Sequence, residues 1–277
     1  MAWAGFDVSR KALVHRMPAL PLMFLLALGQ APLLAVWWAF EPGEFGPGYL
    51  APAAGSVALN VVANVAFIVA FQRSPLSVTV PLLSLTPAFT ALFAVPLLGE
   101  VPDALQAAGI ALVVAGALLL NRGEGESAAP AVLWRAFLRE PGARLMVVVA
   151  VCWSLTPSLD KMALASAPAP AHGVVLALGT AAGVLALLVA RGEVSEVRRA
   201  KDSPGLLAVA LVFSAAALGL QLVAINLVWV SIVETVKRGL GSAAALGLGW
   251  LLFGELVTAG RVGAVAVMTV GVAMVLL

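Results

Sequence analysis

Residues 81–120 read PLLSLTPAFTALFAVPLLGEVPDALQAAGIALVVAGALLL, and the fold class follows from this stretch. Its only charges, Glu100 and Asp103, stand between two apolar runs at about 76–98 and 102–120. A helix needs about 20 apolar residues to cross the ~30 Å hydrocarbon core of a bilayer, because it rises about 1.5 Å per residue. The runs are rich in Ala, Gly and Leu and lack the alternation of a strand, so each predicts a membrane-spanning helix.

The composition of the whole chain also indicates a lipid environment. Of the 277 residues, 62% are hydrophobic and only 11% are charged. About a quarter of the residues of a soluble domain are charged, so most of this exterior must face lipid. The net charge of +2 gives no basic excess for nucleic acid. One cysteine and two widely separated histidines predict neither a disulfide framework nor a metal cluster, and we expect no cofactor.

Apolar runs of spanning length recur along the chain. We predict nine complete spans, at about 20–40, 49–71, 76–98, 102–120, 144–164, 173–190, 205–226, 231–253 and 261–277. The residues before the first run, with Trp3 and Lys11, look like the end of one more helix. We therefore expect an all-α integral membrane protein of ten-helix design, whose first helix is truncated by a late start. Residues 131–140 are either a short amphipathic helix on the membrane surface or an ordinary linker.

The sequence also contains an internal repeat. A shift of 150 residues places Trp3 on Trp153, and a shift of 155 places the Gly-Glu pair 99–100 on the pair 254–255. We divide the chain into a first repeat, a linker and a second repeat, at 1–120, 121–143 and 144–277. Five helices per repeat is an odd number, so the two repeats insert with opposite orientations. Inverted repeats are typical of secondary transporters, with substrate bound near the midplane.

The repeat has a recognisable pattern. Residues 81–123 combine a Pro-containing helix, a Gly-Glu pair and a Gln-x-x-Gly helix that ends in a Gly-containing apolar run. Residues 251–277 are similar, with Arg261 in place of Gln106. These patterns, together with the Trp-x7-Lys spacing at the first helix of each copy, resemble the EamA-type transporters of the drug/metabolite transporter superfamily. The resemblance implies ten helices around a central cavity, no ATP-hydrolysing domain, and substrates that range from amino acids and drugs to sugars and phosphorylated metabolites.

The basic residues are distributed very unevenly between the two sides of the predicted membrane. With ten spans, thirteen of the sixteen Lys and Arg residues fall in loops after odd-numbered helices, and three (Lys161, Lys237 and Arg238) fall on the other side. Cytoplasmic loops carry the excess of Lys and Arg, so the first set is predicted to be cytoplasmic and both termini outside. Characterised relatives of this architecture are generally drawn with both termini inside, so the resemblance implies the opposite orientation.

We predict that a reporter fused after Leu277 will be exposed on the outer side of the membrane. Alkaline phosphatase fused there should be active, and a fluorescent protein that folds only in the cytoplasm should stay dark. The reverse pair of results would contradict the orientation derived from the charges and favour the one implied by the resemblance.

Uncharged polar side chains within the spans are candidates for a substrate cavity, because lipid offers them no hydrogen-bond partner. Asn60 and Asn64 are one turn apart and share a helix face. Thr86 lies in the proline-containing fourth helix, and Gln30 stands alone in its helix. Trp153 has the size to stack on a substrate. For the polar residues the alternative is hydrogen bonding between helices or to the backbone of their own helix, and for Trp153 it is a packing or membrane-interface role.

Two acidic residues and the histidines are predicted to have local structural roles. Glu100 and Glu255 fall in turns just before a helix, where a carboxylate favours the exposed N–H groups. The alternative, a functional role, is that either glutamate binds a coupling proton. His15, in a basic loop, and His172, at a helix start, are both predicted to lie at the membrane interface.

The strongest candidate site is the run ETVKR at 234–238. Glu234 lies one turn before Lys237 and Arg238, so it can pair with either. The ninth helix begins either near Ser231, with the charges one to two turns inside, or at Lys237, with the charges among the headgroups. The Lys-Arg pair resembles the ninth-helix pair with which triose-phosphate and nucleotide-sugar translocators bind phosphate, which implies an anion site. Glu234 would partly neutralise that site, so a zwitterion such as an amino acid is also a candidate substrate.

These observations lead to one functional hypothesis and two rivals. We expect a secondary active transporter that exports a small polar or anionic metabolite across the plasma or inner membrane by alternating access, and not an enzyme. Its substrate would bind between the third, fourth, eighth and ninth helices, with Lys237 and Arg238 as anion contacts and Asn64 and Thr86 as hydrogen-bonding partners. The rivals are a translocase for polyprenyl-phosphate-linked lipids and a membrane scaffold that transports nothing. The expected partners are the substrate, the bilayer and an optional coupling proton; the oligomeric state is not predicted.

Overall fold

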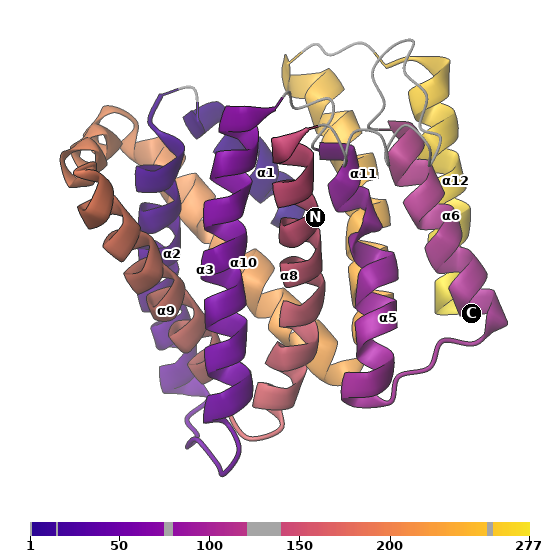
Figure 1. Cartoon of the computed structure of the whole chain (residues 1–277), viewed down its shortest axis with the longest axis horizontal. Helices are drawn as coiled ribbons and strands as arrows, with labels where there is room; N and C mark the ends of the chain where they lie inside the picture. Colours follow the sequence, from indigo (N-terminus) through magenta and orange to yellow (C-terminus); the bar gives the residue numbers. More distant parts are fainter. Residues whose placement is uncertain (1, 15, 75–79, 121–139, 254–256) are drawn as a thin grey trace. The chain divides into compact units, whose positions relative to one another are not determined.

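The computed structural model describes residues 2–14, 16–74, 80–120, 140–253 and 257–277 (Figure 1). Within these ranges all regular secondary structure is helical, with no strand. The α-helices are α1 (Ala2–Val14), α2 (Ala19–Phe40), α3 (Leu50–Arg73), α5 (Thr86–Leu98), α6 (Ala104–Leu120), α8 (Pro141–Leu164), α9 (Ala169–Arg191), α10 (Pro204–Leu227), α11 (Val230–Phe253) and α12 (Ala259–Leu276). Two 3-10 helices complete the described part, η1 (Val80–Leu85) and η2 (Val194–Asp202).

The predicted all-α membrane fold is confirmed. Helices α2 to α12 match the predicted spans to within four residues at each end, except at the start of the fourth span. Six of the described helices (α2, α3, α8, α9, α10 and α12) are long and apolar enough to cross a membrane, and α5 and α6 are shorter apolar helices. The chain is therefore a multi-pass membrane protein. The exact count of ten spans is not confirmed by these lengths.

The fourth span differs from the single helix that its apolar run predicts. Residues 80–85 form the 3-10 helix η1, and the α-helix begins only at Thr86, followed by Pro87. Proline has no N–H to donate and is tolerated in the first turn of a helix, so Pro87 favours a new start at this point. At its other end α5 is closed by Gly99, whose φ of 70° is a left-handed conformation that glycine adopts without strain.

Some predicted features lie outside the described residues. They are most of the linker at 121–143, nearly all of the amphipathic segment at 131–140, and the second Gly-Glu pair, Gly254-Glu255. The short first helix that was predicted around Trp3 and Lys11 is present as α1.

The helices form two compact units. Unit 1 contains Met1–Val61 and Leu159–Leu227, and unit 2 contains Val62–Ser158 and Val228–Leu277. The boundaries fall inside α3 and α8. Each unit takes segments from both predicted repeats, so the compact units and the sequence repeats divide the chain differently. The repeats themselves stay a prediction.

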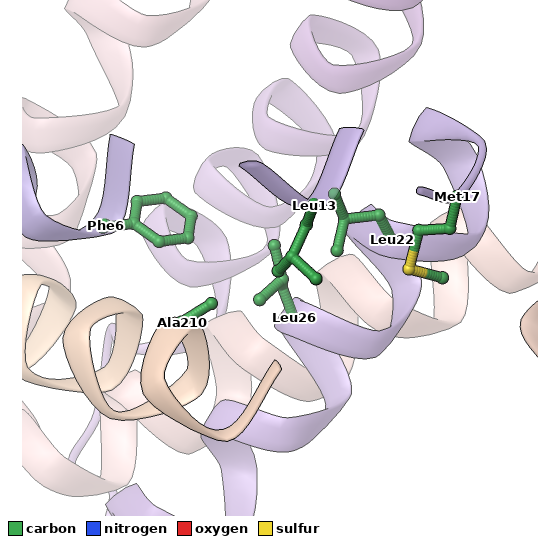
Figure 2. Close-up of a cluster of buried hydrophobic side chains, with 6 residues drawn as sticks. All are labelled: Phe6, Leu13, Met17, Leu22, Leu26 and Ala210. Carbon is green, nitrogen blue, oxygen red and sulfur yellow. The ribbon is translucent and has the colours of Figure 1, made fainter. Parts of the chain in front are cut away.

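In unit 1, α1 packs against α10, and α2 packs against α9. The first of these contacts surrounds a cluster of buried apolar side chains (Figure 2), which are Phe6, Leu13, Met17, Leu22, Leu26 and Ala210. Gly5 lets α10 approach α1 closely, because a Cβ at this position would lie 2.6 Å from the ring of Phe213. This packing holds the N-terminal helix against the rest of the unit.

In unit 2, α6 and α12 lie side by side (Figure 1) and pack closely through glycines. A Cβ built on Gly271 would lie 2.6 Å from the backbone oxygen of Gly109, and the reverse contact has the same length. Small residues allow such close helix approach in membranes, where dispersion contacts replace the hydrophobic effect as the driving force. Val113 and Met268 fill the space beside this contact.

We predict that Gly271→Ala will lower the free energy of unfolding by about 1–3 kcal/mol, because its methyl group would meet backbone that cannot move aside. Gly263→Ala on the same helix is the matched control, since a Cβ there has nothing within 4 Å. Unfolding can be followed on heating with a thiol-reactive dye, because Cys152 is the only cysteine and is buried. Equal melting temperatures for the two variants would contradict the packing described for α6 and α12.

Candidate functional site

The start of α11 places the charged run inside a helix. The sequence left two starts open, and α11 begins at Val230, close to the earlier one. With a rise of about 1.5 Å per residue, Glu234 and Arg238 lie about 6 Å and 12 Å along the helix from its first residue. Glu234 is only 4% exposed. The charged run is therefore one to two turns inside α11.

Glu100 fixes this helix start. Its carboxylate accepts a hydrogen bond of 2.7 Å from the backbone N–H of Val230, and the side chain is 5% exposed. A carboxylate at a helix N-terminus pairs with unsatisfied N–H groups and with the positive end of the helix dipole. The predicted role is thus confirmed, but for α11 rather than for the helix that follows Glu100 in sequence. At the start of that helix, Asp103 and Gln106 exchange hydrogen bonds instead.

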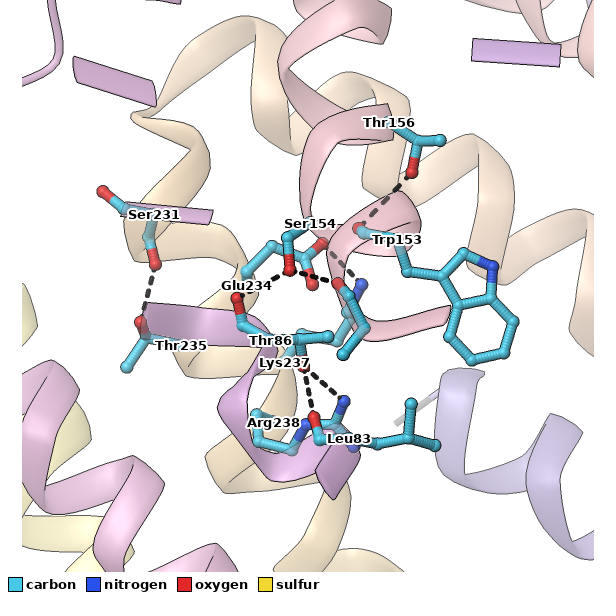
Figure 3. A network of polar contacts seen from close by, with 11 residues as sticks. Leu83, Thr86, Trp153, Ser154, Thr156, Ser231, Glu234, Thr235, Lys237 and Arg238 are labelled. Carbon is cyan, nitrogen blue, oxygen red and sulfur yellow. Dashed lines mark hydrogen bonds and ion pairs between the residues drawn. The ribbon is translucent and has the colours of Figure 1, made fainter. Parts of the chain in front are cut away.

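The three charges of α11 take part in a group of polar contacts, called the network below (Figure 3). Lys237 Nζ lies 2.5 Å from Glu234 Oε1, in an ion pair one turn apart. Arg238 Nη2 donates to Thr86 Oγ1 at 2.7 Å. The Glu234 side chain is 5% exposed and the Lys237 side chain 26% exposed, so the lysine end of the pair is the more accessible one. The run therefore holds one internal ion pair and one guanidinium directed to α5.

Thr86 links this network to α8. Its hydroxyl donates to the Leu83 carbonyl at 2.6 Å, while the oxygen accepts from Arg238. Its carbonyl accepts from Ser154 Oγ at 3.1 Å, and Ser154 also lies 2.6 Å from the Ala150 carbonyl. Thr86 is buried at the start of α5, where the 3-10 segment before it leaves carbonyls to be satisfied by side chains. Thr86 was predicted to hydrogen-bond a substrate beside the cations; its hydroxyl contacts Arg238 directly, and its contact with a substrate stays a prediction.

Three buried hydroxyls lie one turn away from this network. Thr90, Ser158 and Ser231 are at most 1% exposed, and their oxygens make no hydrogen bond to protein atoms of the described residues. Thr90 follows Thr86 by one turn, and Ser158 follows Ser154 by one turn. A buried polar group without a partner is costly, and such groups mark places where a polar ligand or water fits.

The remaining predicted residues divide between the units. In unit 2, Trp153 packs its ring against Phe67 at a centroid distance of 5.4 Å, and Asn64 is half-buried on α3. In unit 1, Asn60 donates to the Ser56 carbonyl at 3.1 Å, and Gln30 is half-buried on α2. For Asn60 this is the backbone hydrogen bond that the sequence offered as the ordinary alternative. A shallow hollow near Trp38 at the end of α2 contains none of these candidate residues.

Sequence reasoning missed a second polar cluster, in unit 1. It joins Tyr49, Ser56, Asp160 and His172 by hydrogen bonds between buried side chains. His172 lies in the first turn of α9, as predicted for a helix start, but it is fully buried. The available signal was Asp160, a carboxylate near the end of an apolar span, since an ionisable residue within a span is a candidate functional residue by default. Within the described residues, no three His, Cys, Asp or Glu side chains are grouped to hold a metal ion.

Comparison with known families supports the resemblance seen in the sequence. Residues 1–122 match the family model of the EamA-like transporter family. These residues form an EamA-like segment. The segment ends two residues beyond the predicted first repeat. The EamA-like match indicates a membrane transporter of the drug/metabolite type.

Comparison with solved structures supports the fold. One crystal structure is 16% identical to this chain, with a TM-score of 0.71 over 99% of this chain and 92% of the other. At this identity the similarity concerns the fold alone. A search of curated proteins gives no significant match.

The EamA-like segment contains only part of the candidate site. Gln30, Asn60, Asn64 and Thr86 lie within residues 1–122, as does Glu100. The members beyond residue 122 are Trp153, Glu234, Lys237 and Arg238. The family match therefore covers the residues that position α11 but not the charges that α11 carries.

We predict that Glu100→Ala will lower the free energy of unfolding by about 1–3 kcal/mol, because it leaves the buried Val230 N–H without its acceptor. Glu100→Gln keeps an acceptor oxygen and should lower the free energy of unfolding by less. Glu41→Ala, which removes an exposed loop carboxylate, is the control and should change little. The same Cys152 dye assay measures all three, and a Glu100→Ala protein as stable as the control would contradict the capping role.

Proposed function

We propose that this protein is a secondary active transporter that exports a small polar or anionic metabolite by alternating access, without a catalytic step of its own. The observation that carries the proposal is the charged network on α11. Its residues Glu234, Lys237 and Arg238 are the only charges between Ser231 and Phe253, and together they carry a net charge of +1. In a medium of low dielectric a net charge is costly, and an anionic ligand that completes the network lowers this cost.

The chemistry of the network favours an oxygen anion such as a phosphate or a carboxylate. Arg238 supplies a planar guanidinium, which matches two oxygens of such a group, and Lys237 supplies a compact point charge. The hydroxyls of Thr90, Ser158 and Ser231 add donors that no protein atom uses within the described residues. A ligand with several oxygens would satisfy hydroxyls and cations together.

Glu234 gives the site a means of releasing its ligand. Its carboxylate holds Lys237 in the structure described here. An incoming anion competes with that carboxylate for the same ammonium group, so binding exchanges one ion pair for another. In the empty state Lys237 stays paired with Glu234, and in the loaded state a singly charged anion brings the net charge of the network to zero, so neither state carries a large uncompensated charge through alternating access. A zwitterion fits the same scheme, since Glu234 would hold its ammonium group.

We propose that this transporter resides in the plasma or inner membrane. Under the orientation that the Lys and Arg distribution predicts, the N-terminal end of α11 faces outward. The network would then lie closer to the outer face than to the cytoplasmic one, where it would release an exported ligand. The substitutions below test the site whatever the direction of transport.

Transport can be measured in proteoliposomes preloaded with unlabelled probe, with radiolabelled inorganic phosphate, glycerol 3-phosphate and serine as external probes. We expect Arg238→Ala to lower exchange of an accepted probe about tenfold or more, because a charge-assisted hydrogen bond contributes about 1.5–3 kcal/mol. The exchange rate of Arg238→Lys should fall between those of wild type and Arg238→Ala, since lysine keeps the positive charge but lacks the planar guanidinium group. Arg144→Ala, which removes an exposed cation at the start of α8, is the matched control and should exchange at the wild-type rate.

The double variant Glu234→Gln with Lys237→Gln separates binding from folding. It removes both members of the ion pair together, so neither is left without the other, and the net charge of +1 on Arg238 is the same as in wild type; the thermal stability should stay close to wild type. Its exchange of anionic probes should still be lost. Unchanged exchange in Arg238→Ala and in the double variant would overturn the anion site. If wild-type protein exchanges no soluble probe but flips a polyprenyl phosphate, it is a lipid translocase. If it does neither, it is a scaffold.

A further inference from the structure

The second polar cluster, in unit 1, consists of Tyr49, Ser56, Asp160 and His172 and is called the Asp160–His172 cluster below. Tyr49 Oη lies 3.0 Å from His172 Nδ1, and His172 Nε2 lies 3.1 Å from Asp160 Oδ1. Ser56 Oγ donates to the same oxygen of Asp160. All four residues are at most 4% exposed. The chain thus places a continuous series of hydrogen bonds, centred on an ionisable pair, inside one bundle of apolar helices.

The series is consistent with one arrangement of hydrogens. Ser56 and the Nε2–H of a neutral His172 both donate to Asp160, and the Tyr49 hydroxyl donates to Nδ1. Tyr49 precedes the first residue of α3, and burial, reinforced by the charge of Asp160, raises its pKa to about 12, so it stays a phenol. In this state the cluster carries the single negative charge of Asp160. Each hydrogen bond is made, so the arrangement is stable without any further ligand.

The cluster can take up one proton with little change in geometry. A proton added to the Nδ1 lone pair of His172 gives an imidazolium ion paired with the carboxylate of Asp160. The Tyr49 hydroxyl then rotates, so that its oxygen accepts from Nδ1–H and its hydrogen turns away. The charge of the cluster changes from −1 to zero. No bond between heavy atoms forms or breaks, and no other reactant is needed.

The surrounding elements supply few other charges. Helix α2, which packs against α9, has no titratable residue, and neither does the unit 1 part of α3. On α9 the other charge is Arg191, nineteen residues after His172. On α8, Lys161 follows Asp160 and points about 100° further round the helix. The loop before α3 carries Glu41 and Glu44, both exposed.

The position of the cluster gives it a route to water. Asp160 lies four residues before the end of α8 and His172 is the fourth residue of α9, so both are about one turn from the helix ends. Two loops cover them: Gly46 N donates to the Ser166 carbonyl at 2.7 Å, and Ser166 Oγ donates to the Pro47 carbonyl at 3.0 Å. Separation of these loops would expose Tyr49 and, through it, His172.

We propose that the Asp160–His172 cluster binds and releases the proton that drives transport, an inference that rests on the proposed transport function. A buried carboxylate hydrogen-bonded to a serine and a neutral histidine gains most from a mobile proton, since that proton removes its net charge. Helix packing alone would be served by uncharged residues at these positions. The predicted orientation places the two covering loops outside, so protons would enter there and substrate would leave in exchange.

The first test measures protonation directly and needs no substrate. The chain has two histidines, so a His15→Gln background leaves His172 as the single histidine signal in protein labelled with 15N-histidine. In lipid nanodiscs, we expect a neutral form protonated at Nε2 at high pH and a doubly protonated ring at low pH. Asp160→Asn keeps the acceptor oxygen but not the charge that pairs with the imidazolium, and should weaken uptake of the second proton. A ring that stays neutral from pH 8.5 to pH 5 overturns the proposal.

The second test couples protonation to transport in proteoliposomes, with the accepted probe among phosphate, glycerol 3-phosphate and serine. If one proton is exchanged per substrate, an interior one pH unit more acidic than the medium should support about a tenfold accumulation of probe. His172→Gln and Asp160→Asn should abolish this accumulation while exchange at equal pH continues. Ser214→Ala removes another buried hydroxyl of unit 1, which bonds only its own helix at Leu211, and should accumulate probe like wild type.

The outcomes separate the two proposals. Exchange at equal pH without any effect of the pH gradient overturns proton coupling and leaves the transport function standing. Accumulation that persists in both His172→Gln and Asp160→Asn also overturns the role of this cluster. If no probe is exchanged by wild-type protein, the proposed transport function fails, and coupling fails with it even where His172 titrates. Should either variant fold poorly in the Cys152 dye assay, the titration of the His15→Gln protein still decides whether the cluster binds a proton.

Discussion

A membrane interior offers no water to polar groups, and every feature of this protein reflects that constraint. Each backbone N–H and C=O within a span must be paired by the chain itself, which is why the described spans are helices. The ends of helices are the weak points, because their terminal N–H and C=O groups have no intrahelical partner. Glu100 shows how the protein satisfies such an end, by bringing a carboxylate 2.7 Å from the first N–H of α11. That bond sets the register of the helix that carries the charged network.

Because of the same constraint, polar side chains within the bundle indicate where a ligand can bind. The structure joins several of them into two clusters, one in each compact unit. The network in unit 2 is centred on Lys237 and Arg238 and carries a net positive charge. The cluster in unit 1 is centred on Asp160 and His172 and carries a negative charge until it takes up a proton. The proposals above assign a different ligand to each sign, an oxygen anion to the first and a proton to the second.

Both clusters are departures from the predicted duplication. At a shift of 155 residues the run 234–238 falls on 79–83, TVPLL, which has no charge. At a shift of 150, Asp160 falls on Arg10 and His172 falls on Leu22. Glu100, at a position that the two copies share, serves the helical frame by bonding the start of α11. The run 234–238 has no charged counterpart in the first copy, and at the position of Asp160 the two copies carry opposite charges.

The sequence by itself determined the helices and the location of the charged run, because helix length and apolarity are properties of consecutive residues. Predicted spans and observed helices differ by four residues at most, except where prolines divide the fourth span into η1 and α5. The tertiary structure alone decided which side chains meet. It brought Arg238 to Thr86, 152 residues away, and Glu100 to Val230, 130 residues away. It also joined Ser56, Asp160 and His172, which no local pattern connects. Contacts between helices depend on how the helices pack and rotate about their axes, and in a chain of uniformly apolar helices the sequence pattern leaves that rotation unspecified.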